Sequence, residues 1–524
     1  MKKIFFIVVL AAFSCNSTLQ TTVNQEPEKK ADYNPVPYAA TITQEELKEM
    51  LYTYASDSFQ GRETGTPGQK KAVNYLKDQY QKMGIPAANA NGDYFQKVPL
   101  QGNNVPKASL TVNDKEYEIG KDYVTYSGPD TMEATYSQLI YAGYGIEAEN
   151  YSDYEGLDVK DKVVLIKAGE PKNQDGTYTI SGTSETTGKW SNIRQAFAAK
   201  IELAKDKGAA GLLFLDDDNF KVLASQYEYM KNRRNGRMRL KQSDGENFFY
   251  FFINQEIAAS LYPEINTKNT AENVAATIKV NFEGSSNPID SENVVAWIKG
   301  SEKPDEYIVI SAHLDHEGIK NEEIYNGADD DGSGTIAVLE IAEAFQNAVK
   351  EGNGPKRSIV FLHVTAEEKG LLGSAYYADN PIFPLEQTVA NLNIDMIGRI
   401  DPKREGDRNY VYLIGSDKLS TELHTVSEEI NTKYTNITLD YTYNDENDPN
   451  RFYYRSDHYN FAKNNVPIIF YFNGTHDDYH RPSDTPDKIE YDLLANRAKL
   501  VFHTAWELAN RENRIVADKA IEAK

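Results

Sequence analysis

Two short segments near the start of the chain have the hydrophobic spacing of amphipathic helices. Both lie within residues 43–84, where Leu47 and Leu51 in the first segment, and Leu76 and Tyr80 in the second, are four residues apart. Positions at this spacing share one face of an α-helix. The stretch between the two segments, "SFQGRETGTPGQ", is rich in polar residues, Gly and Pro and predicts a loop.

The pattern changes twice further along the chain. Residues 105–285 contain short apolar strands, such as "SQLIYAGYGI" and "DKVVLIKAGEP", and one helical stretch, "IRQAFAAKIELAKDKG", and so predict a β-rich unit. Residues 286–515 alternate apolar strands with amphipathic helices, which predicts an α/β fold with a mixed, largely parallel central sheet flanked by helices. Residues 212–260 receive no functional prediction, and their basic stretch 232–242 is expected to be a solvated loop.

The first residues, "MKKIFFIVVLAAFSC", have the pattern of an export signal. Two lysines precede an apolar run that is too short to span a bilayer as a helix. Residues 1–15 resemble a bacterial lipoprotein signal, in which the cysteine, here Cys15, is lipidated and becomes the mature N-terminus; an ordinary secretory signal with an incidental cysteine is the alternative. Residues 16–42 are polar and contain Pro, and predict a flexible tether. We therefore expect an exported bacterial protein, periplasmic or at the cell surface, held at the outer surface of a membrane by a lipid anchor.

Composition restricts the classes of partner. The 524 residues carry a net charge of -23, and because phosphate binding requires clustered Lys and Arg, nucleic acid is not an expected partner. Cys15 is the only cysteine, so no internal disulfide can form. Nothing in the composition indicates an oligomeric state.

Polar side chains that can bind metals occur where the apolar strands of residues 286–515 end. In open α/β sheets, sites form at the carboxyl ends of the strands. Imidazole and carboxylate ligands together suit zinc, and two metal ions about 3.5–4 Å apart can share a carboxylate. The residues concerned are His313, Asp315, Asp329, Asp330, Asp331, Glu367, Glu368, Asp395, Tyr479 and His480. The sequence therefore predicts a zinc centre at this edge of the sheet.

Two spacings suggest a division of roles. His313 and Asp315 are two residues apart on an extended segment and lie on one face, so one can bind metal while the other accepts the imidazole N–H and fixes its tautomer. Glu367 and Glu368 are adjacent and point in different directions. One of them is therefore expected to bind metal and the other to face the substrate as a base.

Five motifs in order, "SAHLDH", "NGADDDGSG", "TAEEKGLLGS", "NIDMIG" and "DDYHRPSDTPDKI", resemble the M28 family of di-zinc exopeptidases. The resemblance implies a zinc-exopeptidase fold, two Zn²⁺ per chain and peptide substrates. Residues 105–285 resemble a protease-associated (PA) domain through "YAGYGI", "DYEGLDVKDKVVLIKAGEP" and "AKDKGAAGLLF". Residues 43–104 resemble the opening helical region of the family, so the peptidase domain is expected to be interrupted by the PA-like insert and completed by residues 286–515.

The resemblance also implies the metal ligands. One zinc ion is expected on His313 and Asp395 and the other on Glu368 and His480. Asp330 is expected to bridge the two ions.

It further implies how the other site residues act. Glu367 matches the general base that activates the attacking water, and Tyr479 matches a hydroxyl that stabilises the oxyanion. Asp315 and Asp331 are expected to support the ligands, and the bond from Asp330 to Asp331 resembles one that is cis in the family.

The terminus that is attacked stays open at this point. Acidic residues around the site favour a substrate ammonium group, which predicts an aminopeptidase that removes N-terminal residues. Arg399 or Arg481 could instead bind a terminal carboxylate, as in a carboxypeptidase-type relative. A glutaminyl-cyclase-type relative and a catalytically inactive, peptidase-like binding protein are the remaining alternatives, and the complete ligand set weighs against both.

The remaining histidines are not expected to bind metal. They are His363 inside an apolar strand, His424 and His503 on predicted helices, His458 in a segment expected to shape the site, and His316 and His476 near the motifs but without a role in the family pattern.

Overall fold

The computed structural model describes most of the chain after the expected signal and tether. Residues 1–33, which include Cys15, and residues 232–236 and 242–246 of the basic region lie outside the described part. The described residues are 34–103, 105–129, 131–185, 189–190, 192–231, 237–241, 247–283 and 286–519.

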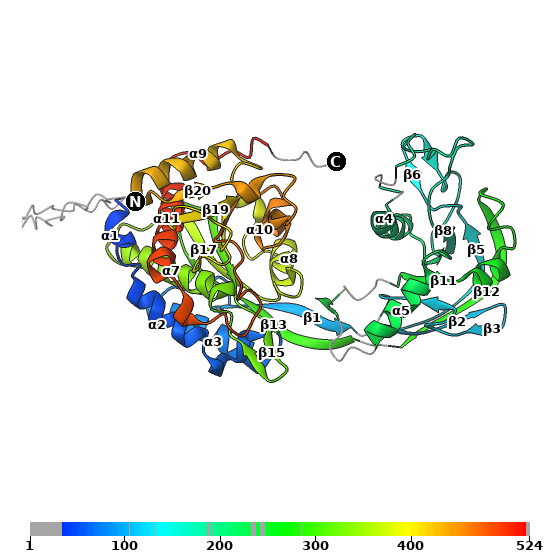
Figure 1. Cartoon of the computed structure of the whole chain (residues 1–524), viewed down its shortest axis with the longest axis horizontal. Coiled ribbons are helices and arrows are strands. Elements are labelled where there is room, and N and C mark those ends of the chain that lie inside the picture. Colours follow the sequence, from blue (N-terminus) through cyan, green and yellow to red (C-terminus); the bar gives the residue numbers. More distant parts are fainter. Residues whose placement is uncertain are drawn as a thin grey trace, which may run out of the picture.

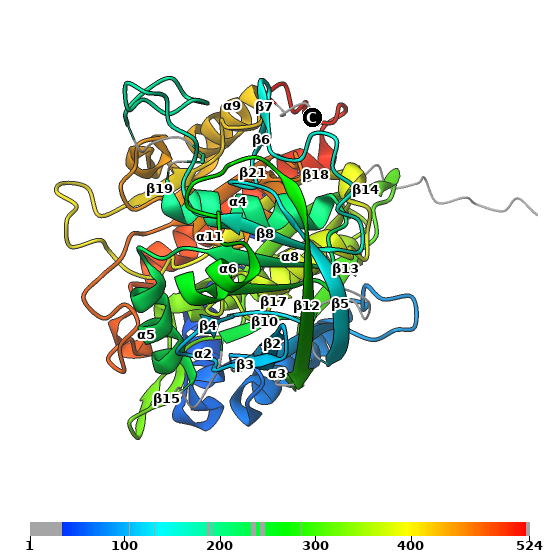
Figure 2. The same ribbon diagram turned by 90° about the vertical axis from the view of Figure 1, so that its right-hand side faces the viewer.

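Two lobes, each built on its own sheet, make up the described chain (Figures 1 and 2). We call residues 34–103, 237–241 and 286–519 the site lobe, and residues 105–231 and 247–283, with the gaps given above, the inserted lobe. The site lobe contains a nine-stranded sheet in the order β10-β1-β13-β17-β14-β18-β21-β19-β20. Its strands are β1 (Phe95–Asn103), β10 (Arg237–Leu240), β13 (Ser286–Ile298), β14 (Lys303–His313), β17 (Arg357–Val364), β18 (Thr388–Ile394), β19 (Tyr410–Ile414), β20 (Thr438–Asp440) and β21 (Ile468–Phe472).

The centre of this sheet is parallel, as the sequence predicts. Strands β17, β14, β18 and β21 pair in parallel, whereas β1 and β13 pair antiparallel. Helices cover both faces. The site lobe contains α1 (Val36–Ala39), α2 (Gln44–Tyr54), α3 (Pro67–Met83), α7 (Gly334–Lys350), α8 (Leu372–Asp379), α9 (Thr421–Ile430), α10 (His458–Ala462) and α11 (Tyr491–Asn510). The mixed α/β fold class is confirmed.

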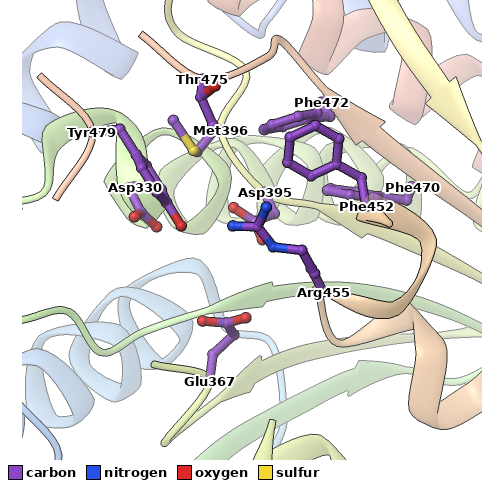
Figure 3. A pocket seen from close by; sticks show the side chains of 10 residues that line it. All are labelled: Asp330, Glu367, Asp395, Met396, Phe452, Arg455, Phe470, Phe472, Thr475 and Tyr479. Carbon is purple, nitrogen blue, oxygen red and sulfur yellow. The ribbon is translucent and has the colours of Figure 1, made fainter. Parts of the chain in front are cut away.

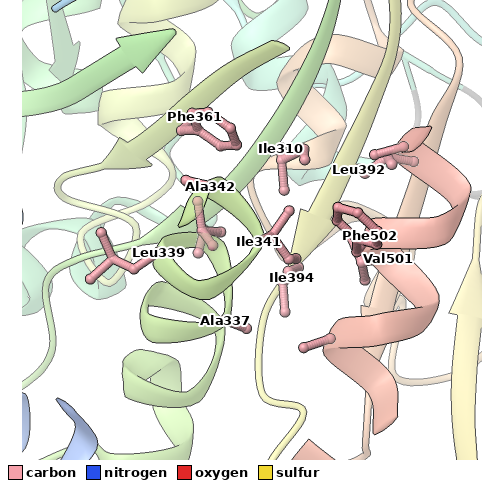
Figure 4. Close-up of a cluster of buried hydrophobic side chains, with 14 of the residues drawn as sticks. Ile310, Ala337, Leu339, Ile341, Ala342, Phe361, Leu392, Ile394, Val501 and Phe502 are labelled. Carbon is pink, nitrogen blue, oxygen red and sulfur yellow. The ribbon is translucent and has the colours of Figure 1, made fainter. Parts of the chain in front are cut away.

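The main core of the site lobe lies between the sheet and one layer of helices (Figure 4). Ile310 of β14, Phe361 of β17 and Leu392 of β18 meet Ile341 of α7 and Phe502 of α11, and all five side chains are fully buried. Alternate positions of the strands face this core, and burying them fixes the register and direction of each strand. The strand ends that carry the polar motifs are thereby held at one edge.

The start of the site lobe differs from the expected tether. Residues 34–42 were assigned to the tether, but α1 forms within them and Ile42 is fully buried. Tyr38 stacks on Trp506 with ring centroids 5.5 Å apart, and its hydroxyl donates to Glu351 Oε2 at 2.8 Å. Burial of Tyr38, Ala39 and Ile42 docks the segment against the core.

The inserted lobe contains an eight-stranded sheet in the order β3-β2-β12-β5-β8-β9-β11-β4. Its strands are β2 (Lys107–Val112), β3 (Lys115–Tyr117), β4 (Tyr123–Val124), β5 (Met132–Tyr141), β8 (Val163–Lys167), β9 (Gly211–Leu215), β11 (Phe249–Ile253) and β12 (Glu272–Glu283), and its helices are α4 (Ile193–Asp206), α5 (Phe220–Lys231) and α6 (Gln255–Leu261). Two small hairpins complete the described strands: β6 (Glu147–Ala148) with β7 (Tyr151–Ser152), and β15 (Gly318–Lys320) with β16 (Glu323–Tyr325).

The chain passes between the lobes on neighbouring strands. β1 ends at Asn103 and β13 begins at Ser286, and these two residues are paired partners. The chain therefore leaves the site lobe after Asn103 and re-enters it at Ser286. One segment between these residues is an exception: β10, inside residues 212–260, returns to the site lobe and pairs with β1, with Leu240 opposite Leu100. In the described residues no helix combines the length and apolarity needed to cross a bilayer.

Candidate metal centre

The predicted site residues converge where the parallel strands end. His313 is the last residue of β14, Glu367 and Glu368 follow β17, and Asp395 follows β18. Parallel neighbours end at the same edge of the sheet, which is why segments far apart in the sequence meet there. Figure 3 shows Asp395 and Glu367 facing one pocket together with Asp330, which lies just before α7.

One group of donor atoms forms around His313. Its Nε2 lies 3.2 Å from Asp330 Oδ1 and 3.6 Å from Asp395 Oδ1. His313 Nδ1 lies 3.1 Å from the backbone oxygen of Asp315, which orients the ring. The imidazole is 1% exposed, and Nε2 has no hydrogen-bond partner among the described residues.

A second group forms around His480. Its Nε2 lies 3.0 Å from Asp330 Oδ2 and 3.1 Å from Glu368 Oε2. The two oxygens of Asp330 therefore face different groups, as expected of a bridging ligand. The Asp330–Asp331 peptide bond is cis, as the sequence resemblance implies.

Buried polar atoms test whether metal ions fit here. His313 Nε2, His316 Nδ1, Asp330 Oδ2 and Glu368 Oε1 are all buried without a hydrogen-bond partner among the described residues. Buried polar groups are normally paired, and converging unpaired imidazole and carboxylate atoms are the donor set that zinc binds. The residues therefore fit two zinc ions.

The pKa shifts of the donor residues are also consistent with bound cations. Burial raises the pKa of Glu368, but the neighbouring imidazoles of His316 and His480 outweigh burial and lower that pKa to about 2. Burial lowers the pKa of His480, but the neighbouring carboxylates of Asp330 and Glu368 raise it to about 10. The carboxylates thus stabilise positive charge at the centre, which divalent cations also supply.

Asp315 differs from its predicted role. Its carboxylate does not bind the His313 ring; Oδ2 accepts from the hydroxyl of Thr64 at 2.8 Å, and Oδ1 accepts from the backbone N–H of Glu367 at 3.1 Å. The ring of His313 turns instead to the backbone oxygen of Asp315. Asp315 therefore positions the Glu367 backbone. The two-residue spacing predicted a contact between Asp315 and the His313 ring, but it could not show whether the carboxylate or the backbone carbonyl of Asp315 makes that contact.

Asp331 supports the ligands through the backbone. Oδ2 accepts from the N–H of His313 at 3.1 Å, and Oδ1 accepts from Gly334 and Met396 at 3.0 Å each. These bonds connect β14, the start of α7 and the segment after β18. Asp331 thus joins three of the elements that carry the ligands.

Glu367 and Tyr479 both line the pocket beside the donor groups (Figure 3). Burial raises the pKa of Glu367 well above its usual range, with His313 opposing and the carboxylates of Glu368 and Asp395 adding to the rise. Burial, together with the nearby carboxylates, also raises the pKa of Tyr479. Tyr479 therefore remains a neutral phenol with an O–H to donate.

Neither of the two arginines predicted to contact substrate is among the residues that line the pocket of Figure 3. Arg399 Nη2 is 2.9 Å from Asp478 Oδ2, and Arg399 is not among the residues that line the pocket. Arg481 is exposed and lines a second hollow together with Tyr479 and His480. Arg399 is thus held by Asp478, whereas Arg481 lies beside two of the predicted site residues.

Sequence reasoning missed the walls of the pocket. Arg455, Phe452, Phe470 and Phe472 line it together with Met396. Phe470 and Phe472 are two residues apart on β21, so period-2 spacing could have placed them on one face. Arg455 begins the stretch "RSDHYNF", which was expected to shape the site, but nothing local indicated that its side chain faces the pocket.

Five of the other histidines contact side chains or backbone groups away from the metal centre or beside it, and none of these contacts is with a proposed metal ligand. His363 Nε2 lies 2.7 Å from the hydroxyl of Tyr80, which confirms its packed role. The others contact Asp329 (His476), Ser416 (His424), the Tyr453 carbonyl (His458) and the Tyr434 ring (His503). His316 is the exception, because it joins the metal centre: its Nδ1 lies 2.9 Å from Glu368 Oε1.

Comparison with known proteins agrees with the motifs. Residues 293–505 match the model of peptidase family M28. Aminopeptidase YwaD of Bacillus subtilis is 22% identical over 538 residues, covering 98% of this chain and 96% of that protein. Mouse aminopeptidase NAALADL1 is 37% identical over 108 residues, a match that spans 20% of this chain and only 14% of that protein. Among solved structures, an aminopeptidase from Aneurinibacillus sp. strain AM-1 is 21% identical with a TM-score of 0.46, covering 93% of this chain and 98% of that chain.

Proposed function

We propose that the protein is a zinc-dependent aminopeptidase that removes N-terminal residues from peptides, and the match of residues 293–505 to the model of peptidase family M28 supports this. The observation that carries the proposal is the position of Asp330. Its two oxygens lie between His313 on one side and His480 on the other, and Asp330 also lines the pocket that contains Glu367.

The residues divide the chemistry as follows. His313, Asp395, Asp330, Glu368 and His480 would hold the metal. Bound zinc ions supply Lewis acidity, which polarises a carbonyl group and acidifies a water molecule.

Proton transfer and charge stabilisation come from the chain itself. The Glu367 carboxylate accepts the proton of the attacking water and then transfers it to the amine that leaves. The neutral Tyr479 hydroxyl donates a hydrogen bond to the oxyanion of the tetrahedral intermediate. Asp315 keeps Glu367 in place by accepting its backbone N–H at 3.1 Å.

Selectivity follows from the lining of the pocket. Asp330, Glu367 and Asp395 are acidic and favour a substrate ammonium group, whereas Phe470 and Phe472 offer an apolar wall. Large apolar N-terminal residues are therefore the expected substrates. Arg455 is the pocket residue that could instead bind a carboxylate.

The test compares one tripeptide with an N-terminal Phe in three forms: free, N-acetylated and C-amidated. The zinc-loaded protein should cleave the free and amidated forms alike and leave the acetylated form intact, and it should prefer Phe to Asp at the first position. A Glu367→Gln preparation purified in parallel controls for contaminating peptidases. Cleavage of the acetylated form with loss of the amidated one would make the protein a carboxypeptidase, and no cleavage of any form would refute the proposal.

Two further parts of the proposal concern the regions outside the catalytic part. The inserted lobe is proposed to be a PA-like domain, supported by its β-rich sheet between the two halves of the site lobe. The chain is proposed to be exported and anchored to the outer surface of a membrane through a lipid on Cys15, supported by the lysine and apolar pattern of residues 1–15.

A further inference from the structure

We infer that His316 is a fourth protein ligand in the donor group of His480, Glu368 and Asp330, so that the protein closes this metal position and leaves the His313 position open. The inference rests on the proposed zinc-dependent function. It concerns a histidine that the sequence motifs leave without a role.

The contacts of His316 point into the centre. Nδ1 lies 2.9 Å from Glu368 Oε1 and 3.7 Å from Asp330 Oδ2. The rings of His316 and His480 approach from different directions, with centroids 5.7 Å apart and planes at 75°. Zinc bonds of 2.0–2.2 Å in a tetrahedron place donor atoms about 3.3–3.6 Å apart. The distances from the His316 and His480 rings to the carboxylate oxygens, 2.9–3.7 Å, lie around this range.

Burial gives the ring no other polar partner. His316 is 0% exposed, and neither of its nitrogens has a hydrogen-bond partner among the described residues. An imidazole buried without a partner is destabilising, and the carboxylates of Glu368 and Asp330 lie within 4 Å of its Nδ1.

The backbone is shaped to admit the ring. Gly327 has φ +55°, and a Cβ at that position would lie 2.5 Å from the His316 ring. The same Cβ would lie 2.2 Å from the backbone oxygen of Asp330, so glycine leaves room for both the ring and the Asp330 backbone. The N–H of His316 donates to the backbone oxygen of Arg62, which fixes the segment after β14.

Among the described residues, the group around His313 has three ligand candidates and no fourth. His313, Asp330 and Asp395 contribute donors, and Asp331 does not, because both of its oxygens accept backbone N–H groups. Asp330 and Asp395 also line the substrate pocket, whereas His316 does not. Closed zinc sites are typical of tightly held ions, and catalytic sites keep an open position. One zinc ion should therefore be retained strongly, and the ion facing the pocket should exchange more readily.

The experiment loads the full chain with Zn²⁺ and follows release to a colorimetric chelator, with total zinc measured by elemental analysis. The wild type should hold two ions and release them in two steps. His316→Ala and His316→Asn should each weaken the tight step by more than about 100-fold, beyond the 10–100-fold loss typical of a hydrogen-bond partner. His363→Gln, which alters a buried histidine bound to Tyr80, should release zinc as the wild type does.

The outcomes separate the two proposals. A wild type that binds no zinc overturns both this inference and the proposed function. The inference alone would be overturned if His316→Ala releases both zinc ions as the wild type does. It would also be overturned if His316→Asn, which keeps a donor near the Nδ1 position, binds zinc as tightly as the wild type. If the variants do not fold, zinc-edge X-ray absorption of the wild type decides, because His313, His316 and His480 would supply three imidazoles to two ions rather than two.

Discussion

Replacing the buried Arg62 by methionine tests how the N-terminal segment supports the metal centre. Arg62 is 1% exposed, and its guanidinium donates to four backbone oxygens. Nε donates to Leu314 at 3.2 Å, Nη1 to Tyr54 at 3.3 Å and Asn326 at 2.7 Å, and Nη2 to Gly327 at 2.9 Å. The side chain thus joins α2 to the two segments that flank His316.

The hydrogen bonds lost with Arg62 determine how far the free energy of unfolding should fall. After Arg62→Met, Leu314 O keeps the hydroxyl of Tyr54 and Gly327 O keeps the N–H of Gly332. Tyr54 O and Asn326 O lose the donor, and a buried unpaired carbonyl costs about 1–3 kcal/mol. Methionine also removes a buried charge, which offsets part of this loss. We therefore expect the free energy of unfolding to fall by about 2–4 kcal/mol.

Urea unfolding of the zinc-free chain measures this without linkage to metal binding. Trp297 and Trp506 lie in the site lobe and Trp190 in the inserted lobe, so a Trp190→Phe background makes fluorescence report the site lobe alone. With a slope near 3 kcal/mol per M, the midpoint should fall by about 1 M. The matched control is Arg408→Met.

Arg408 is an exposed arginine, paired with Glu490 and Asp492, and its loss should change the free energy of unfolding by less than about 1 kcal/mol. If Arg62→Met unfolds at the same urea concentration as Arg408→Met, the buried contacts of Arg62 do not stabilise the lobe and the reasoning is wrong. Arg62→Met should also release zinc more readily than the wild type, because the loop beside His316 loosens.

Two further predictions concern the base and the anchor. Glu367→Gln removes the proton acceptor but none of the proposed metal ligands. We therefore expect kcat to fall by about 10²–10⁴-fold while elemental analysis still finds two zinc ions per chain. Retained activity would show that another group is the base. Cys15→Ser should move the protein from the detergent phase to the aqueous phase, and a wild type that is fully aqueous with no lipid mass would contradict the lipid anchor.

The strand and helix pattern was predictable because its causes are local. The buried positions of α2, such as Leu47, Leu51 and Tyr54, follow helical spacing. Strand β17 is buried throughout and β14 is buried from Tyr307 onward, and apolar residues predominate in both buried stretches. The approximate place of the metal centre followed as well, because parallel strands end at one edge and the polar residues come directly after them. The family model then confirmed the motif resemblance over residues 293–505.

Side-chain directions around the site were not predictable in the same way. Arg399 follows Asp395 closely in the sequence, yet it pairs with Asp478, whereas Arg455, far along the chain, lines the pocket. His316 was set aside because no motif required it, but burial beside Glu368 brings it into the centre. The direction of each of these side chains depends on a partner that is far away in the sequence.

The sequence by itself therefore determined the elements, the residue types at the strand ends and the chemistry those residues can perform. Their backbone preferences and hydrophobic periods act over a few residues, so the sequence displays them directly. The tertiary structure decided the pairing of β10 with β1, the docking of residues 34–42 and the direction in which His316, Arg399 and Arg455 point. These depend on burial and on hydrogen bonds between residues far apart in the chain, and only the packed fold brings those partners within reach.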